Sequence, residues 1–230
     1  MPATVNTPII TIKNLSLSYV PKHQVLTDIN LQIKRGELVG IIGANGSGKS
    51  SLLKCLAGLN KNYSGSVMVK SQIGFVAQTT ELANNFPATV MEVVISGTIG
   101  NHPQRIFAGR DDHARAQELL EKMGLAAHAG DSFWSLSGGQ RQRALIARAL
   151  CSQAGVYLFD EPANHLDKHT TKNFYDLMQD LHQHQSTIII VGHDVEHLLP
   201  IATRIIMLES GRIVADAPAK TFAATRRAKC

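Results

Sequence analysis

Eight consecutive residues have the types and order that a phosphate-binding loop requires. They fit G-x-x-x-x-G-K-[ST] and are Gly43, Ala44, Asn45, Gly46, Ser47, Gly48, Lys49 and Ser50. Glycines let the backbone curl so that several N–H groups point at phosphate oxygens, and a following helix adds its N-terminal dipole. Lys49 supplies charge for the outer phosphates, and the Ser50 hydroxyl is a hard oxygen ligand for Mg²⁺. The stretch predicts a nucleotide site that includes Ser51; the alternative is a flexible glycine-rich turn.

Two acidic residues follow an apolar stretch further along the chain. Asp160 and Glu161 come directly after residues 156–159 (VYLF), which have the composition of a buried strand. A carboxylate at the tip of a strand beside the phosphate loop is suited to the Mg²⁺ shell, so Asp160 joins Ser50 as a candidate metal ligand. Glu161 is placed to polarise an attacking water. The alternative is a pair of solvated acids at the end of a strand.

A third pattern lies at residues 193–197 (HDVEH), which fit H-x-x-E-H. In one class of zinc peptidases this pattern supplies two metal-binding histidines and a glutamate that activates water. Such a site requires both histidines and the glutamate on one helix. Here the apolar run 187–191 predicts a strand that leads to His193, with a helix only from about Asp194. We therefore expect unrelated roles, with His197 on the helix surface, and keep a zinc peptidase as the alternative.

Strands and helices alternate around these motifs. Apolar and polar residues alternate at 9–19 and 25–33 as in half-buried strands, and the apolar stretch 37–43 predicts a buried central strand. The apolar spacing then becomes helical at 49–59. Further strands are expected at 65–69, 72–77, 156–160, 186–192 and 203–209, and helices at 88–96, 111–123, 139–151, 168–183 and from 194. Strands alternating with helices indicate an α/β domain with a mainly parallel sheet.

Composition excludes several classes of protein. The chain has 230 residues, 44% of them apolar and 18% charged, which is typical of a soluble globular protein. We expect neither a membrane span nor a secretion signal, because no apolar run approaches the required length. The net charge of +5 suits an anionic ligand or membrane surface and is too small to indicate a nucleic acid partner. Cys55, Cys151 and Cys230 form no CxxC pair, which favours free thiols in a reducing cytosol.

The stretch 136–140 (LSGGQ) opens a predicted helix. With the phosphate loop and the strand ending in Asp160, in this order, it makes nearly the whole chain resemble the nucleotide-binding domains of ABC transporters. The resemblance implies a P-loop NTPase (RecA-like) core, an N-terminal antiparallel β subdomain and an inserted α-helical subdomain. It implies one domain over 1–230, with the nucleotide-binding core at 1–84 and 154–230 and the helical signature subdomain at 85–153.

The resemblance also gives expected roles to single residues. Tyr19, at the end of the first strand, matches an aromatic that stacks on adenine; the alternative is an ordinary strand-end tyrosine. Gln78 matches a glutamine that senses Mg²⁺ and contacts the membrane partner, and it joins Glu161 and His193 as a catalytic candidate. His193 matches a histidine that contacts the γ-phosphate of ATP. Asp167 matches an aspartate in a loop that crosses a dimer interface.

One chain carries one phosphate loop and one LSGGQ signature. The Ser137 hydroxyl and the N–H groups of Gly138 and Gly139 lie at a helix start, where they form a second anion site, and the resemblance adds Gln140 to the binding residues. In the family this site closes over ATP held by the other copy. The resemblance therefore implies a head-to-tail homodimer that binds two ATP molecules with Mg²⁺ and hydrolyses them to drive transport.

The partners and cargo follow from the same resemblance. A chain without a membrane span must act on separate permease subunits at the cytoplasmic face of the membrane, and lone domains of this kind are typical of bacterial importers with a solute-binding protein. Residues 85–94 (NFPATVMEVV) resemble zinc and manganese importers, so uptake of one of these metals is expected. Residues 137–144 (SGGQRQRA) also resemble siderophore and cobalamin importers, and an exporter is a further alternative.

Overall fold

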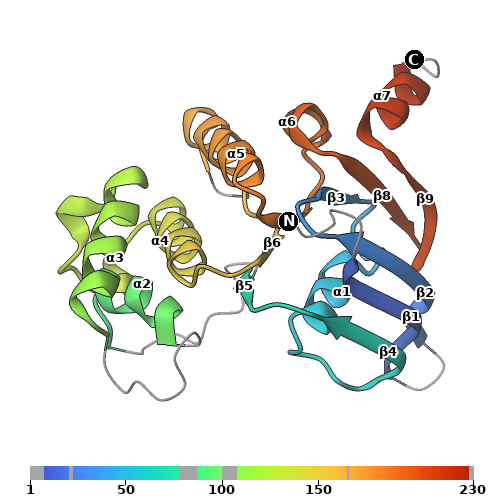
Figure 1. Cartoon of the computed structure of the whole chain (residues 1–230), viewed down its shortest axis with the longest axis horizontal. Coiled ribbons are helices and arrows are strands. Elements are labelled where there is room, and N and C mark those ends of the chain that lie inside the picture. The colour runs from blue at the N-terminus through green and yellow to red at the C-terminus, as the bar shows by residue number, and fades with distance from the viewer. Residues whose placement is uncertain (1–7, 21–22, 78–86, 100–107, 165, 228–230) are drawn as a thin grey trace, which may run out of the picture.

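The computed structural model describes residues 8–20, 23–77, 87–99, 108–164 and 166–227, without the side chains of 225–227. Gln78 therefore lies outside the described residues. Three strands form an antiparallel sheet in the order β2-β1-β4. They are β1 (Pro8–Val20), β2 (His23–Lys34) and β4 (Tyr63–Val69). This sheet is the blue and teal layer of Figure 1, and it confirms the expected antiparallel N-terminal layer.

A second sheet has the strand order β5-β6-β7-β3-β8-β9. Five of its strands are parallel, and only β9 is antiparallel, to β8. The strands are β3 (Leu38–Ile42), β5 (Ile73–Val76), β6 (Val156–Asp160), β7 (Thr187–Val191), β8 (Arg204–Glu209) and β9 (Arg212–Pro218). Every residue of β3, β6 and β7 is buried, as the continuous apolar runs predict. Their carboxyl ends meet at one edge.

Helices cover the six-stranded sheet on both faces. Helix α1 (Lys49–Leu56) contacts strands of both sheets, so it lies between them. The other face carries α5 (Lys168–Gln183), α6 (Val195–Ile201) and α7 (Ala219–Arg227), which contact β7, β3 and β8. Figure 1 shows α5 and α6 side by side on that face.

Three further helices pack against one another beside the β5 end of the sheet (Figure 1). They are α2 (Val90–Ile99), α3 (Arg110–Lys122) and α4 (Gly138–Cys151). Short 3₁₀ turns at Ala126–His128 and Phe133–Ser135 connect α3 to α4. Their core residues belong to the same apolar cluster as α5 and the sheet face beneath it.

The expected α/β architecture with a mainly parallel sheet is confirmed. The expected helix 49–59 was too long: it ends at Leu56, and Gly58 then takes a φ of 71° in a turn. Strand β9 and helix α7 were not expected at all. Cys55 and Cys151 are free and buried, and burial raises the pKa of each thiol to about 11. Among the described helices, none has the length and apolar character needed to cross a membrane.

Helix α2 begins with a capping box. The carboxylate of Glu92 accepts hydrogen bonds from the Thr89 N–H at 2.7 Å and the Thr89 hydroxyl at 2.9 Å, and the Glu92 N–H donates to that hydroxyl at 3.2 Å. These bonds lower the pKa of Glu92, and the bond from the Thr89 N–H contributes most. Within the segment that resembles metal importers, the presence of Thr89 and Glu92 is thus explained by the start of α2.

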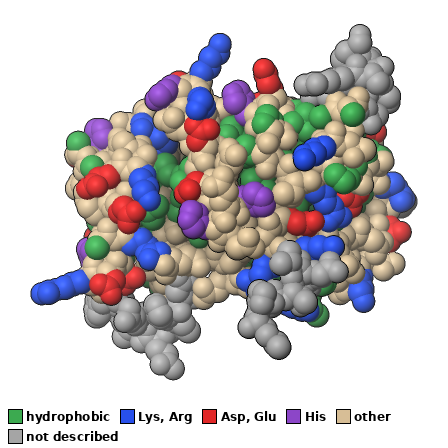
Figure 2. Space-filling view, turned by 45° about the horizontal axis from the view of Figure 1, so that its top comes forward, with side chains coloured by type: hydrophobic (Ala, Val, Ile, Leu, Met, Phe, Trp, Pro, Cys, Tyr) green, Lys and Arg blue, Asp and Glu red, His purple; other side chains and the backbone are tan. Residues whose placement is uncertain are grey.

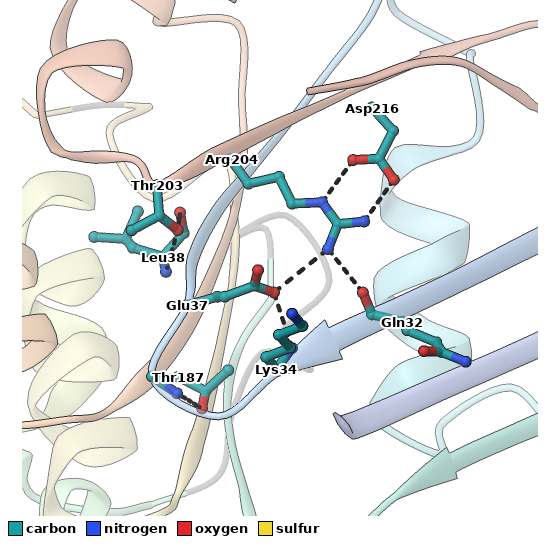
Figure 3. A network of polar contacts seen from close by, with 9 residues as sticks. Gln32, Lys34, Glu37, Leu38, Thr187, Thr203, Arg204 and Asp216 are labelled. Atoms are coloured by element: carbon teal, nitrogen blue, oxygen red, sulfur yellow. Dashed lines mark hydrogen bonds and ion pairs between the residues drawn. The ribbon is translucent and has the colours of Figure 1, made fainter. Parts of the chain in front are cut away.

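A single arginine joins the two sheets. The Arg204 guanidinium on β8 donates to Asp216 on β9 at 2.6 and 2.5 Å, and to the Gln32 carbonyl on β2 at 2.8 Å. It also lies 3.4 Å from the carboxylate of Glu37, just before β3 (Figure 3). The hydrogen bonds to Asp216 raise the pKa of Arg204, so its charge persists at any working pH. The side chain is only 22% exposed, so these bonds are partly shielded from water.

We predict that Arg204→Met destabilises the fold by on the order of 2 kcal/mol, because it leaves a partly buried carboxylate and a carbonyl without their donor. Urea unfolding followed by circular dichroism measures the change. Lys172→Met is the matched control: its pair with Asp176 is 68% and 57% exposed, and its loss is expected to cost less than about 0.5 kcal/mol. Equal unfolding midpoints for the two variants would contradict the role given to Arg204.

Candidate functional site

The phosphate loop connects β3 to α1 with a backbone that only glycine allows at two positions. A Cβ atom on Gly43 would lie 2.1 Å from the carbonyl oxygen of Leu208. Gly48 has a φ of 100°, and a Cβ there would lie 2.7 Å from the Val25 carbonyl oxygen. The loop therefore rests directly on neighbouring backbone, and its glycines at these positions are required by space as well as by conformation.

The loop encloses polar groups that suit an anion. Lys49 is 5% exposed, and its ammonium donates to the carbonyls of Gly43 at 3.0 Å and Ala44 at 2.9 Å. The Ser47 hydroxyl oxygen is buried and makes no hydrogen bond within the described part of the chain. A phosphate oxygen would satisfy such a hydroxyl. The adjoining cavity of about 310 Å³ is lined by Val25, Asn45, Gly46, Gly48, Lys49, Ser50, Ser51 and Glu161.

Tyr19 lies beside this cavity. Its hydroxyl donates to the Ser51 hydroxyl at 3.2 Å, and the residue is 57% exposed. A large exposed ring at the margin of a phosphate site can stack on a planar base.

The structure brings Ser50 and Asp160 into contact. The Ser50 hydroxyl donates to the Asp160 carboxylate at 2.9 Å, although one residue opens α1 and the other ends β6. Asp160 is only 1% exposed. A hydroxyl and a carboxylate at the rim of the phosphate loop are the hard oxygen donors that Mg²⁺ prefers. The two residues therefore fit the cation expected there.

Glu161 stands between two cavities. It lines the phosphate-loop cavity and a second one of about 430 Å³, whose lining also includes His193 and Asn164. Its backbone has a φ of 48°, which is uncommon for a residue with a side chain, and its N–H donates to the Val191 carbonyl at 2.9 Å. The side-chain amide of Asn164 donates to the Glu161 carboxylate. The carboxylate is thus fixed from the backbone and from a neighbour.

His193 and His197 lie in different surroundings. His193 is exposed and sits two residues after β7, whereas α6 starts at Val195 with Asp194 as its N-cap. The ring of His197 stacks on Tyr175 at a centroid distance of 5.5 Å, and its Nδ1 lies 2.9 Å from an Asp194 carboxylate oxygen. Because His193 precedes the helix, the two histidines do not form the one-turn pair of an H-x-x-E-H zinc site.

Potential metal ligands do not gather into a cluster in the described part of the chain. Within the described ranges, no group of three His, Cys, Asp or Glu residues is placed to hold a metal ion. Histidine side chains on the face shown in Figure 2 stand apart from one another.

The LSGGQ signature forms the first turn of α4. Ser137 is the N-cap: its hydroxyl accepts from the Gln140 N–H at 3.3 Å, and its own N–H donates to the Gln140 side-chain oxygen at 2.8 Å. Gly138 and Gly139 follow as the first helical residues. Trp134, the single tryptophan, lies just before this turn, with the Arg141 guanidinium 6.0 Å from its ring centroid. None of residues 137–140 lines the phosphate-loop cavity of the same chain.

Asp167 caps the next helix rather than facing the cavity. Its carboxylate accepts from the Thr170 N–H at 3.0 Å and from the Thr170 hydroxyl at 2.6 Å at the start of α5. The hydrogen bond from that hydroxyl is the main cause that lowers the pKa of Asp167.

Two contacts near the site were not expected from the sequence. One is the bond from Asn164 to Glu161. The other joins Gln142 of α4, which is 1% exposed, to the Pro162 carbonyl at 3.2 Å, so the signature helix is tied to the loop after Glu161. Gln142 could have been noticed, because it lies three and four residues before the buried Leu145 and Ile146 on one helix face.

Comparison with known proteins agrees with this geometry. The model of the ABC transporter family matches residues 26–164. The manganese transport ATP-binding protein MntB of Halalkalibacterium halodurans is 34% identical, over 87% of this chain and 83% of that protein. The zinc transport ATP-binding protein TroB of Treponema pallidum is 34% identical, over 90% and 80%. The glutamate/aspartate import ATP-binding protein GltL of Escherichia coli is 36% identical, over 93% and 92%.

Solved structures show the same fold. The dimeric structure of the bacterial ABC transporter cassette MJ0796 aligns with a TM-score of 0.83 and 30% identity, over 91% of this chain and 98% of that one. The same cassette is also known as a dimer with ADP and phosphate after hydrolysis. A transporter described as metal-chelate type aligns with a TM-score of 0.81 and 28% identity, over 94% and 85%. The chain therefore belongs to the ABC transporter family, as one of its ATP-hydrolysing cassettes.

Proposed function

We propose that the chain is the ATPase subunit that energises uptake of zinc or manganese through separate membrane permease subunits, at the cytoplasmic face of the membrane. The observation that carries its ATPase part is the convergence of Lys49, Ser50, Asp160 and Glu161 at one edge of the sheet. The cargo assignment is supported by the relatives MntB and TroB and by residues 85–94. Since the amino-acid importer protein GltL is at least as similar, the cargo needs its own test.

Binding begins at the phosphate loop. The Lys49 ammonium, now bonded to loop carbonyls, turns to the outer phosphates, and the Ser47 hydroxyl gains the partner that it lacks within the described residues. Ser50 and Asp160 would hold Mg²⁺, together with Gln78. When bound, the cation supplies charge that neutralises the phosphate oxygens. Tyr19 stacks on the adenine.

Hydrolysis depends on Glu161 and His193. The Glu161 carboxylate accepts a hydrogen bond from the attacking water and polarises it, while Asn164 holds that carboxylate in place. His193 lines the 430 Å³ cavity together with Glu161 and Asn164, and it donates to the γ-phosphate.

Two copies are required for turnover in this proposal. In a head-to-tail homodimer, the signature binds the ATP of the other copy, because none of its residues lines the phosphate-loop cavity of its own chain. These residues are Ser137, Gly138, Gly139 and Gln140. The Asp167 loop crosses the interface. A solute-binding protein delivers the cargo on the other side of the membrane.

The first test concerns the water-polarising group. Glu161→Gln should lower ATPase turnover at least about 100-fold, because an amide cannot polarise the water, while ATP affinity remains. Stable ATP-bound dimers should accumulate. Glu196→Gln is the control, since Glu196 lines the larger cavity together with Glu161 but is exposed and has no role in the proposed ATP hydrolysis. Turnover near wild type in Glu161→Gln would remove Glu161 from the mechanism.

The second test separates the two histidines. His193→Ala should reduce ATPase activity about 10- to 100-fold, through the lost phosphate contact. His197→Ala should change activity less than about twofold and lower stability by about 1 kcal/mol, because it loses the Tyr175 stack. Equal inactivation of both variants, with one zinc ion per wild-type chain in metal analysis, would support the zinc-site alternative instead.

The third test concerns cargo. Deleting the gene should lower cellular zinc or manganese and give a growth defect that the added metal corrects. Wild-type protein should restore the metal content, whereas Glu161→Gln should not. Normal metal content with impaired uptake of a chelate or an amino acid would reject the metal assignment and leave the ATPase assignment intact.

A further inference from the structure

The signature glutamine makes a contact outside the signature. The Gln140 side-chain nitrogen lies 3.1 Å from Nε2 of His128, at the end of the first 3₁₀ turn. Nδ1 of His128 lies 2.7 Å from a carboxylate oxygen of Asp131. The Asp131 N–H donates to the His128 carbonyl at 3.0 Å, so the two residues form one tight turn. Neither residue matches a motif of the sequence.

Hydrogen-bond chemistry allows only one assignment of this chain of contacts. The Gln140 side-chain oxygen accepts from the Ser137 N–H, so the amide nitrogen is the group that faces His128. An amide nitrogen only donates, and Nε2 of His128 must therefore accept. The imidazole proton is then on Nδ1, from which it donates to Asp131. Asp131 selects the tautomer whose Nε2 accepts, and this tautomer stabilises the same orientation of the Gln140 amide that the Ser137 N–H requires.

That orientation matters at Ser137. With its amide reversed, Gln140 would present hydrogens to the Ser137 N–H, and half of the capping box would be lost. In the observed arrangement the Ser137 hydroxyl accepts from the Gln140 N–H, so its own hydrogen is able to donate to an anion. The turn that carries Asp131 is itself anchored, because the Asp131 carbonyl accepts from the Val90 N–H of α2 at 3.0 Å.

We propose that His128 and Asp131 are positioning residues, which orient Gln140 so that Ser137 is prepared to bind the phosphate of the ATP held by the second copy. The inference rests on the proposed function, since it assumes that the signature acts across a dimer interface. His128 and Asp131 are 39% and 52% exposed at the side chain, so their contact adds little to the stability of the fold.

Three substitutions separate this role from a structural one. His128→Ala removes both contacts. His128→Asn places an amide near the position of Nδ1, so it keeps the Asp131 contact but cannot reach Gln140. His128→Gln places a carbonyl oxygen near the position of Nε2 and restores the acceptor for Gln140. A role in the local turn predicts rescue by Asn, whereas the proposed role predicts rescue by Gln.

The experiment measures ATP-dependent dimerisation of the full chain by sedimentation, with each substitution added to Glu161→Gln. The dissociation constant of the dimer should rise about 3- to 10-fold with His128→Ala and with His128→Asn. With His128→Gln it should equal that of the Glu161→Gln parent. ATP binding to the monomer should be unchanged in all of them. Equal dimerisation in every variant, or rescue by Asn alone, overturns the inference.

A second measurement does not depend on ATP. The ¹⁵N shifts of His128 in the full chain, with His128→Ala for assignment, should show the tautomer protonated on Nδ1. Protonation on Nε2 overturns the inference even if the dimer is weakened. If Glu161→Gln alone forms no dimer, the proposed function fails, and the tautomer then decides separately whether His128 accepts from Gln140.

Discussion

The hydrogen bond between Ser50 and Asp160 joins residues that are 110 positions apart in the chain. It forms only if β3 and β6 end at the same level, on either side of β7. The parallel register provides this, because Val191 is paired with Asp160 on one side and with Ile41 on the other. The same register places His193 just beyond Val191 and fixes the backbone of Glu161, whose N–H donates to the Val191 carbonyl. One sheet edge therefore sets the relative positions of all these groups.

Polar bonds, in addition to packing, join the elements around this sheet edge. Arg204 joins the antiparallel sheet to the outer strands of the parallel one, and Gln142 joins the signature helix to the loop after Glu161. That bond links α4 to the residue directly after Glu161, which we propose to polarise the water.

Sequence reasoning predicted the parts of the structure that local patterns determine. The phosphate loop follows a buried strand, and α5 spans the expected 168–183. The apolar run 187–191 correctly predicted a strand that ends before His193, with the helix only after it. Strand β9 was missed because its apolar residues adjoin one another in the sequence and none of its residues is buried. The contacts of Asn164 and His128 could not be predicted, since they depend on turns whose geometry is set by tertiary packing.

The metal-importer pattern includes residues that also have a purely local structural role. Thr89 and Glu92, which contribute to that pattern, cap α2, and a capping box serves any helix whatever the protein transports. The part of residues 85–94 that bears on cargo is therefore smaller than the pattern suggests.

The single tryptophan has a practical consequence. Trp134 stands immediately before the signature turn, edge-on to Phe133 and close to the Arg141 guanidinium. Indole emission depends on nearby charge and on water, so the tryptophan fluorescence of the unlabelled protein reports on the surroundings of the signature turn. The cassette thus contains an intrinsic optical probe of its own signature. With the proposed head-to-tail dimer, the approach of the second copy would be followed in real time without attaching a dye.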